Sequence, residues 1–146
     1  MIRRIEKRDE KDYIEMAEEF YSSSAVLHPI PTEYFNRTFS ELMTSDRYAE
    51  GYILEKDGVT AGYALLAKTF SQEAGGLVIW AEELYIKPEF RSHGLGTEFF
   101  KFLEENRSDD VKRIRLEVEL ENTGAVKLYK RLGYDFLEYN QMIKEF

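Results

Sequence analysis

Residues 82–96 read Glu82-Glu83-Leu84-Tyr85-Ile86-Lys87-Pro88-Glu89-Phe90-Arg91-Ser92-His93-Gly94-Leu95-Gly96. The pattern predicts a buried strand, a short turn and a glycine-bearing loop that opens a helix. A helix N-terminus offers unpaired backbone N–H groups and the positive end of the peptide dipoles. Glycines at 94 and 96 let a bulky anion approach the backbone closely. The segment therefore predicts a pyrophosphate cradle a few residues after two carboxylates.

The elements on either side of this segment predict an α+β domain with a mixed sheet and helices on both faces. Helices are expected over residues 10–22 (capped by Asp9), 33–44 (capped by Thr32), 94–106 and 122–132 (capped by Asn122 and ended by Gly133). Strands are expected over residues 2–5, 52–55, 59–70, 77–86 and 113–121, with one or two closing strands over residues 134–144.

Composition narrows the class of protein. The 146 residues fit one domain, residues 1–146, and the chain has no cysteine and a formal net charge of -8. The charge argues against a nucleic-acid partner and is compatible with a cationic substrate. No apolar run approaches the ~20 residues of a membrane span, so none is expected. Residues 1–7 have no apolar h-region, and we therefore expect no secretory signal. We expect a cytoplasmic protein with neither a metal nor a membrane partner.

Two motifs carry a family resemblance. Arg91-Ser92-His93-Gly94-Leu95-Gly96 lacks the Gly-Lys-Ser/Thr of a P-loop and is not a Gly-x-Gly-x-x-Gly fingerprint. It resembles the Gln/Arg-x-x-Gly-x-Gly/Ala signature of the GNAT superfamily of acyl-CoA-dependent N-acetyltransferases. About 30 residues later, Asn122 to Tyr134 is similar to the second conserved block of that family. With the element order, the resemblance covers essentially the whole chain and implies a largely antiparallel sheet with one parallel, splayed strand pair.

The resemblance also implies a site for acetyl-CoA. Its pantetheine would lie where strands at about residues 79–86 and 113–119 splay apart, and would pair with the backbone of the first strand as an added strand does. The residues implied in cofactor binding are Leu84, Tyr85 and Ile86 for the pantetheine, Arg91, Ser92, His93, Gly94, Leu95, Gly96 and Thr97 for the pyrophosphate, and Asn122 and Lys130 beside the cofactor.

The chemistry requires a base, because a protonated amine cannot attack a thioester. Glu82 and Glu83 are the candidates, and strand alternation lets only one face the cleft unless the strand bulges, as this family's strand does. We favour Glu82, which lies nine positions before Arg91 and matches the base position expected of diamine acetyltransferases. A backbone N–H near Leu84 or Tyr85 would stabilise the oxyanion. Tyr129 matches the family tyrosine that protonates the leaving thiolate.

The acceptor side in this family is formed by the first two helices and their connecting loop. The residues implied in acceptor binding are Glu19, Glu33 and Tyr34. A small-molecule amine is the first hypothesis for the acceptor, and a protein or peptide amine is the alternative. A homodimer is a further expectation, with an interface drawn from the closing segment, which contains Phe136, Tyr139, Met142 and Phe146.

Each motif also has a purely structural interpretation. Gly94 and Gly96 suit a tight strand-to-helix turn, Tyr129 a core position, and Asn122 a helix cap. Either glutamate can be an edge charge that prevents aggregation. At the level of function, the chain is alternatively an acyl-CoA sensor without catalysis, or a phosphate-binding protein unrelated to CoA.

Overall fold

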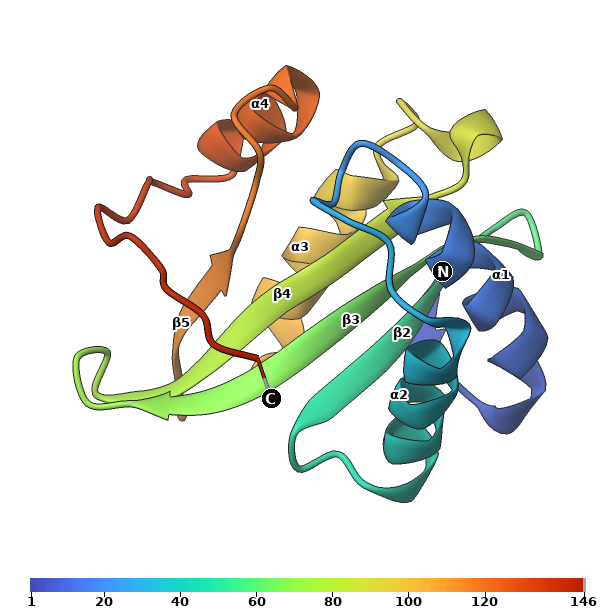
Figure 1. Ribbon diagram of the computed structural model, residues 1–146. Helices are drawn as coiled ribbons and strands as arrows, with labels where there is room; N and C mark the ends of the chain where they lie inside the picture. The colour runs from blue at the N-terminus through green and yellow to red at the C-terminus, as the bar shows by residue number, and fades with distance from the viewer. Residues whose placement is uncertain (146) are drawn as a thin grey trace.

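Five strands form one sheet whose spatial order follows the chain order, β1-β2-β3-β4-β5, in a computed structural model that describes residues 1–145. Strands β1 to β4 pair antiparallel, and β5 lies parallel to β4 (Figure 1). The strands are β1 (Ile2–Arg4), β2 (Ala49–Lys56), β3 (Val59–Ser71), β4 (Gly76–Ile86) and β5 (Val111–Leu116).

Helices cover both faces of this sheet. The helices are α1 (Glu10–Tyr21), α2 (Thr32–Thr44), α3 (Leu95–Asn106) and α4 (Thr123–Arg131), with short 3-10 turns η1 (Lys7–Asp9) and η2 (Pro88–Phe90). Helices α1 and α2 lie in front of the sheet in Figure 1, and α3 lies behind it. Tyr13 and Phe39 pack with Tyr63 in the front core, whereas Phe99 and Phe100 fill the rear core. The predicted α+β architecture is confirmed.

Strands β4 and β5 separate partway along their length. Their pairing runs from Leu77 opposite Val111 to Ala81 opposite Leu116, where β5 ends. Strand β4 continues to Ile86. In the part of the chain that the structure describes, residues 83–86 therefore have a ladder partner only on the β3 side, and Glu82 has none on either side. This divergence is the splayed parallel pair that the resemblance implied.

A β-bulge lies at the point where the two strands separate. Leu65 of β3 pairs with Glu83, but the next residue, Leu66, pairs with Ala81. Glu82 is therefore the extra residue on β4. A bulge of this kind bends the strand and re-aims the side chains around it. It breaks the alternation that would otherwise send Glu82 and Glu83 to opposite faces.

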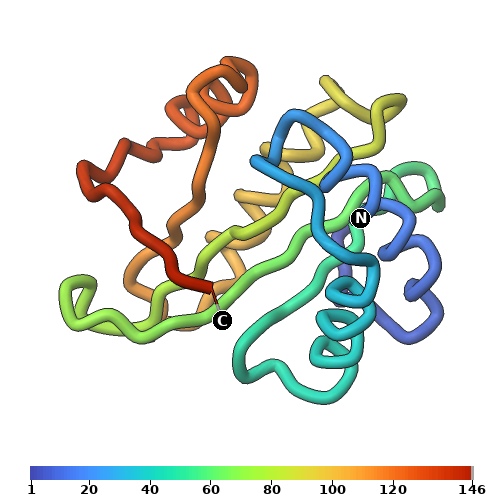
Figure 2. The backbone as a smooth tube through the Cα atoms, in the orientation of Figure 1, coloured from blue at the N-terminus to red at the C-terminus, as the bar shows by residue number. Residues whose placement is uncertain are grey.

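Two predicted strands differ from the structure. The strand expected over residues 113–121 ends at Leu116, because β4 has diverged and offers no further ladder to the residues that follow. The closing strands expected over residues 134–144 do not form within the described chain; this segment runs from α4 back toward the middle of the sheet (Figure 2). Its apolar side chains are largely exposed, Met142 by 96%. Phe146 lies outside the described residues.

Two predicted side-chain caps do not form. Asp9 holds the N-cap position of α1 as expected, but its carboxylate accepts two hydrogen bonds from Arg3, at 2.7 and 2.8 Å, and one from the backbone N–H of Glu6. Helix α2 includes Thr32, and its N-cap position is held by Pro31 without a side-chain cap. Asn122 does cap α4, accepting from the N–H of Ala125 at 3.2 Å. None of the helices in residues 1–145 is long and apolar enough to cross a membrane.

Candidate active site

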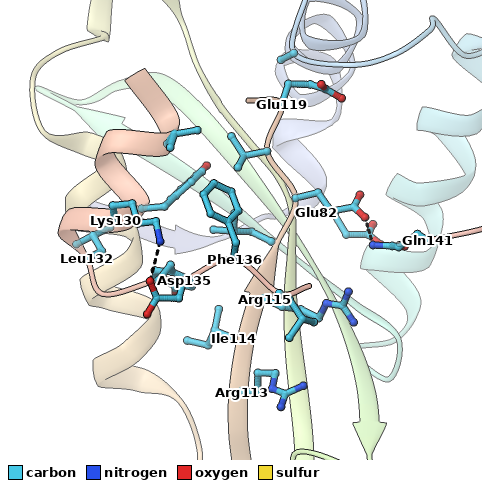
Figure 3. A pocket seen from close by; sticks show the side chains of 18 of the residues that line it. Glu82, Arg113, Ile114, Arg115, Glu119, Lys130, Leu132, Asp135, Phe136 and Gln141 are labelled. Carbon is cyan, nitrogen blue, oxygen red and sulfur yellow. Dashed lines mark hydrogen bonds and ion pairs between the residues drawn. The ribbon is translucent and has the colours of Figure 1, made fainter. Parts of the chain in front are cut away.

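An open cavity of about 1360 Å³ lies between β5, α4, the closing segment and the loop that follows α1. Glu82 and Tyr129, two of the predicted catalytic residues, both line it. Figure 3 shows Glu82 at one side of the cavity, with Lys130 and Asp135 at the opposite side. The fold therefore brings the preferred base and the predicted acid, which are far apart in the sequence, to one cavity.

A smaller cavity of about 260 Å³ adjoins the first. Its lining consists of two aromatic and three acidic residues: Tyr21, Trp80, Glu82, Glu83 and Glu117. Tyr21, Glu82 and Glu117 line both cavities. Glu82 thus stands at the boundary between a large open space and a small acidic recess.

Glu82 is exposed to solvent, yet its environment disfavours its charged form. The protein packed around its carboxyl group raises the pKa of Glu82, and the nearby charges of Glu83 and Glu117 raise it further. A carboxylate whose pKa lies above its ordinary value holds a proton more readily at neutral pH. That property suits a general base, whose ideal pKa lies near the working pH.

Glu83 occupies a different environment. It is only 9% exposed, and each of its carboxylate oxygens accepts a hydroxyl hydrogen bond at 2.7 Å, one from Tyr21 and one from Tyr63. Burial raises the pKa of Glu83, while the two hydroxyl groups act in the opposite direction. With both oxygens engaged, Glu83 is poorly placed to remove a proton from a substrate.

Tyr129 lies on α4, half-buried against aromatic neighbours. Its ring contacts Phe100 edge-on at a centroid distance of 5.4 Å and Tyr134 at 6.2 Å. Burial raises the pKa of the Tyr129 hydroxyl, so this group stays protonated at neutral pH. A protonated hydroxyl beside the cavity can donate a proton. The packing alone equally fits a core aromatic.

The loop between β4 and α3 has two residues in the left-handed backbone region. Gly94, at the N-cap position of α3, has φ 85°, and Ser92 has φ 64°. Because Gly94 has no side chain, it offers no oxygen to the first N–H groups of α3. Arg91 donates from Nε to the carbonyl of Ile86 at 2.8 Å and lies over the Tyr85 ring. A ring nitrogen of His93 lies 2.7 Å from the Arg91 carbonyl.

Gly96 has a packing role in the same loop. A Cβ at this position would lie 3.1 Å from Leu128 of α4 and 3.7 Å from Leu84 of β4. The missing side chain therefore lets α4 pack over the beginning of α3. A Cβ at Gly94 would meet nothing closer than a Glu98 oxygen at 3.9 Å, so that backbone is more open to a ligand.

The remaining cofactor residues are distributed around the splay. The unpaired edge of β4 carries Leu84, Tyr85 and Ile86, and α3 begins with Leu95, Gly96 and Thr97. None of residues 84–86 or 91–97 lines the large cavity. Lys130 does line it, and its Nζ lies 2.7 Å from Asp135. Free strand edge, open loop and uncapped helix together fit a pantetheine with a pyrophosphate at its end.

The structure does not bring the predicted acceptor residues to either cavity. Glu19 accepts a hydrogen bond from the Tyr85 hydroxyl. Burial, and to a smaller extent this hydrogen bond, raise the pKa of Tyr85 to about 12. Glu33 pairs with Arg37 at 2.6 Å, and Arg37 also lies over the ring of Tyr34. Within residues 1–145, no group of three or more histidine, aspartate and glutamate residues could hold a metal ion.

Three residues of the small cavity were not among the catalytic, cofactor-binding or acceptor-binding residues predicted from the sequence. Tyr21 ends α1, Trp80 lies on β4, and Glu117 follows β5. Glu117 was visible as a polar position in an alternating strand, and Tyr21 as an aromatic near a helix end. Neither signal indicates that these residues meet, because their proximity depends on how β4 and β5 diverge.

Comparisons with known proteins point to one family. The acetyltransferase (GNAT) family matches residues 11–134. An uncharacterized N-acetyltransferase of Methanocaldococcus jannaschii is 28% identical over 137 residues, which is 92% of this chain and 60% of that protein. A spermine/spermidine N(1)-acetyltransferase of Bacillus subtilis is 27% identical over 99 residues, 61% of this chain and 65% of that protein.

A solved structure has the same fold. The crystal structure of a possible acetyltransferase from Clostridium difficile 630 superposes with a TM-score of 0.85 at 17% identity, covering 100% of this chain and 97% of that one. This likeness concerns the fold alone. The chain spans about 60% of the length of the first curated relatives that it matches.

Proposed function

The chain belongs to the acetyltransferase (GNAT) family, and we propose that it transfers the acetyl group of acetyl-CoA to a primary amine, in the first instance a small-molecule amine. The family match and the fold support acetyl transfer. The similarity to an acetyltransferase named for spermine and spermidine supports a small amine as acceptor.

One observation carries the assignment of the base. Glu82 is the extra residue of the β4 bulge, at the point where β5 leaves β4, and it lines both cavities. The acetyl end of a pantetheine on the free β4 edge would lie near this point. A carboxylate here, with a raised pKa, is suited to take the proton from an incoming ammonium group, directly or through water.

The proposed mechanism is direct attack. Glu82 removes a proton from the amine, the amine nitrogen attacks the thioester carbonyl, and a backbone N–H near Leu84 or Tyr85 stabilises the oxyanion. The nitrogen of the tetrahedral intermediate loses its second proton to water, and the C–S bond breaks. Tyr129, which is reprotonated from solvent, donates a proton to the leaving thiolate, whose thiol has an ordinary pKa of about 8.5. The chain contains no cysteine, and the mechanism needs no covalent acyl-enzyme.

The co-substrate would be held mainly by backbone. In this proposal the pantetheine amides pair with residues 84–86, and the pyrophosphate accepts from the N–H groups at the beginning of α3. Arg91 and His93 would add charge beside the pyrophosphate, and Asn122 and Lys130 would approach the cofactor from α4. A cytoplasmic location and a homodimer stay predictions.

A screen of acceptors tests the proposal. The protein is incubated with acetyl-CoA and a panel of monoamines, diamines, polyamines and short peptides with free N-termini or lysines, and released CoA is measured as free thiol. Mass spectrometry identifies the acetylated product. We expect turnover with at least one small amine.

Other outcomes would redirect the assignment. Turnover only with peptides would favour a protein acceptor. Tight acetyl-CoA binding without turnover on any amine would favour a sensor and count against the enzyme. If ATP outcompetes CoA in a thermal-shift titration, the loop between β4 and α3 binds phosphate generally, and the CoA assignment fails.

A further inference from the structure

Tyr21 connects the end of α1 to the bulge of β4. Its hydroxyl donates to one carboxylate oxygen of Glu83 at 2.7 Å, and Tyr63 donates to the other oxygen at the same distance. The Tyr21 ring packs against Phe20 and Phe35, at centroid distances of 5.3 and 5.4 Å. The hydroxyl position is therefore fixed by both packing and hydrogen bonding.

Of the two tyrosines that bind Glu83, only Tyr21 lines the cavities. Tyr63 is fully buried, and its ring contacts Tyr13 at 5.2 Å. The chain Tyr63–Glu83–Tyr21 thus runs from the core of the protein to the wall of the small acidic cavity. A buried chain of this kind can hold its last member in one orientation.

The direction of the hydrogen bond determines what Tyr21 offers to the cavity. An ionised carboxylate only accepts hydrogen bonds, so the Tyr21 proton points to Glu83. The lone pairs of the Tyr21 oxygen then remain available for a donor. The groups around the same cavity, Glu82 and Glu117, also accept hydrogen bonds when ionised. The carboxylates and the Tyr21 oxygen make the recess rich in acceptors, although one Glu117 oxygen already accepts from the side chain of Gln141. Trp80 is its aromatic wall, and the Arg115 guanidinium lies 3.9 Å from the centre of that ring.

The size of the small cavity indicates how much of a ligand it holds. Its volume is about 260 Å³. Sites that enclose a whole small ligand are larger, typically about 300–1,000 Å³. It adjoins the large cavity through Tyr21, Glu82 and Glu117. The recess therefore suits one end of a molecule, and its acceptors suit an ammonium group.

We propose that Tyr21, oriented by Glu83, is a positioning residue for the acceptor, and that its hydroxyl oxygen accepts a hydrogen bond from the ammonium group of a cationic primary amine beside Glu82. This inference rests on the proposed acetyl transfer. It assigns the glutamate pair two different tasks, because Glu82 faces the amine as base and Glu83 holds the tyrosine that aligns it. The small cavity should therefore bind a group that donates hydrogen bonds through N–H in preference to a neutral group that only accepts them.

The test compares three tyrosine-to-phenylalanine variants, each of which removes a hydroxyl bonded to a glutamate. Tyr21→Phe removes the hydroxyl at the cavity, and Tyr63→Phe removes the other hydroxyl from Glu83. Tyr52→Phe removes a hydroxyl that donates to Glu50 at 2.8 Å and lines neither cavity. The kinetic constants for the best amine of the screen and for acetyl-CoA are measured separately, alongside thermal unfolding.

For Tyr21→Phe we expect the amine KM to rise about tenfold or more, as for a lost hydrogen bond to a charged group, with the acetyl-CoA KM unchanged. Tyr63→Phe and Tyr52→Phe should change the amine KM much less. Equal effects of Tyr21→Phe and Tyr63→Phe would overturn the proposal, because Tyr63→Phe leaves both the Tyr21 hydroxyl and its acceptor Glu83 in place. An unchanged amine KM in Tyr21→Phe would also overturn it.

A second variant and the activity of the unaltered protein complete the test. Should Tyr21→Phe fail to fold, Glu83→Gln is measured instead; it disturbs the acceptor that orients Tyr21, and an unchanged amine KM would contradict the proposal. Failure of the proposed function is distinguishable, because it would appear as no amine-dependent thiol release in the unaltered protein. A normal unaltered enzyme with an insensitive Tyr21→Phe variant would reject only the positioning role.

Discussion

Glu83 pairs with Leu65 across the β3–β4 ladder, whereas Glu82, its neighbour in the chain, is the extra residue of the bulge and has no such partner. This one-residue insertion separates two chemically identical side chains. Glu83 is enclosed and bonded to two tyrosines, and Glu82 is left open to both cavities. The two glutamates should therefore respond differently to substitution and to pH.

Glu82→Gln should remove most of the activity. The amide has the shape of the carboxylate but cannot take a proton, so we expect kcat to fall about 100-fold or more, as for the loss of a general base. Acetyl-CoA affinity, measured by isothermal titration, should be retained. Glu89→Gln is the matched control, because Glu89 is an exposed residue of η2 that lines neither cavity. Full activity of Glu82→Gln would exclude Glu82 as the base.

The pH dependence of kcat/KM should report the environment of Glu82. Because the pKa of Glu82 is raised, activity should be lost as the pH falls through a value above the ordinary pKa of glutamate. Glu117 contributes to that shift through its charge. In Glu117→Gln the acidic limb of the profile should therefore move to lower pH. A limb that stays in place would mean that another group titrates.

Tyr129→Phe should slow the departure of CoA. The phenyl ring keeps the packing against Phe100 and Tyr134, so folding should be little affected. We expect kcat to fall about 100-fold, the lower range for loss of a general acid, with less effect on acetyl-CoA binding. Steady-state kinetics with free-thiol detection measures this directly. Unchanged kcat would support the interpretation of Tyr129 as a core aromatic.

Tyr134 provides a matched control for Tyr129. Its ring lies in the same aromatic group, but its hydroxyl is buried and has no hydrogen-bond partner in residues 1–145. A buried hydroxyl without a hydrogen-bond partner is costly, so Tyr134→Phe should stabilise the protein by about 1 kcal/mol. The Tyr134 hydroxyl has no part in the proposed proton transfer, so kcat should stay unchanged. A decrease in activity similar to that of Tyr129→Phe would point to a general effect of this aromatic group.

Local features of the chain allowed much of the fold to be predicted from the sequence. The helix over residues 123–131 follows from the Asn122 cap and the glycine at 133, and β4 follows from its apolar run. The order of elements and the two motifs then predicted the family. These features depend on residues close together in the chain, where capping and periodicity act.

The parts that could not be predicted depend on pairing between distant strands. Glu117 continues the alternation of β5, but the strand ends at Leu116 because β4 diverges there. The roles of Glu82 and Glu83 depend on the position of the bulge relative to β3. Tyr21 reaches Glu83 over 62 positions of sequence, so no motif contains both residues.

Gly62→Ala should disturb β4 through the backbone. A Cβ at Gly62 would lie 2.2 Å from the carbonyl oxygen of Tyr85, so β3 and β4 would have to move apart. We expect a loss of about 2 kcal/mol in the free energy of unfolding, as for overpacking of a core. Urea denaturation measures it. In Gly124→Ala the nearest atom to the new Cβ is 4.0 Å away, and stability should change by less than about 0.5 kcal/mol.

Asp9→Asn should destabilise the protein. The loss in free energy of unfolding, relative to the unaltered chain, should be larger at neutral pH than at acidic pH. Asp9 is nearly buried and accepts two hydrogen bonds from Arg3, at 2.7 and 2.8 Å, which lower the pKa of its carboxyl group. A lowered pKa means that the ionised form stabilises the fold above the ordinary pKa of aspartate, and that this contribution is lost as the pH falls through the lowered value. We expect the variant to lose about 2 kcal/mol at neutral pH.

The difference between the two proteins should therefore shrink as the pH is lowered, which urea denaturation at several pH values would reveal. Asp135→Asn is the control, because it removes an ion pair of the same 2.7 Å length that lies on the surface. Solvent screens such a pair, so its loss should leave the unfolding midpoint unchanged. If Asp9→Asn and Asp135→Asn had the same effect on the unfolding midpoint, the contacts of Asp9 with Arg3 and Glu6 would stabilise the fold no more than a surface ion pair does. The prediction would then be wrong.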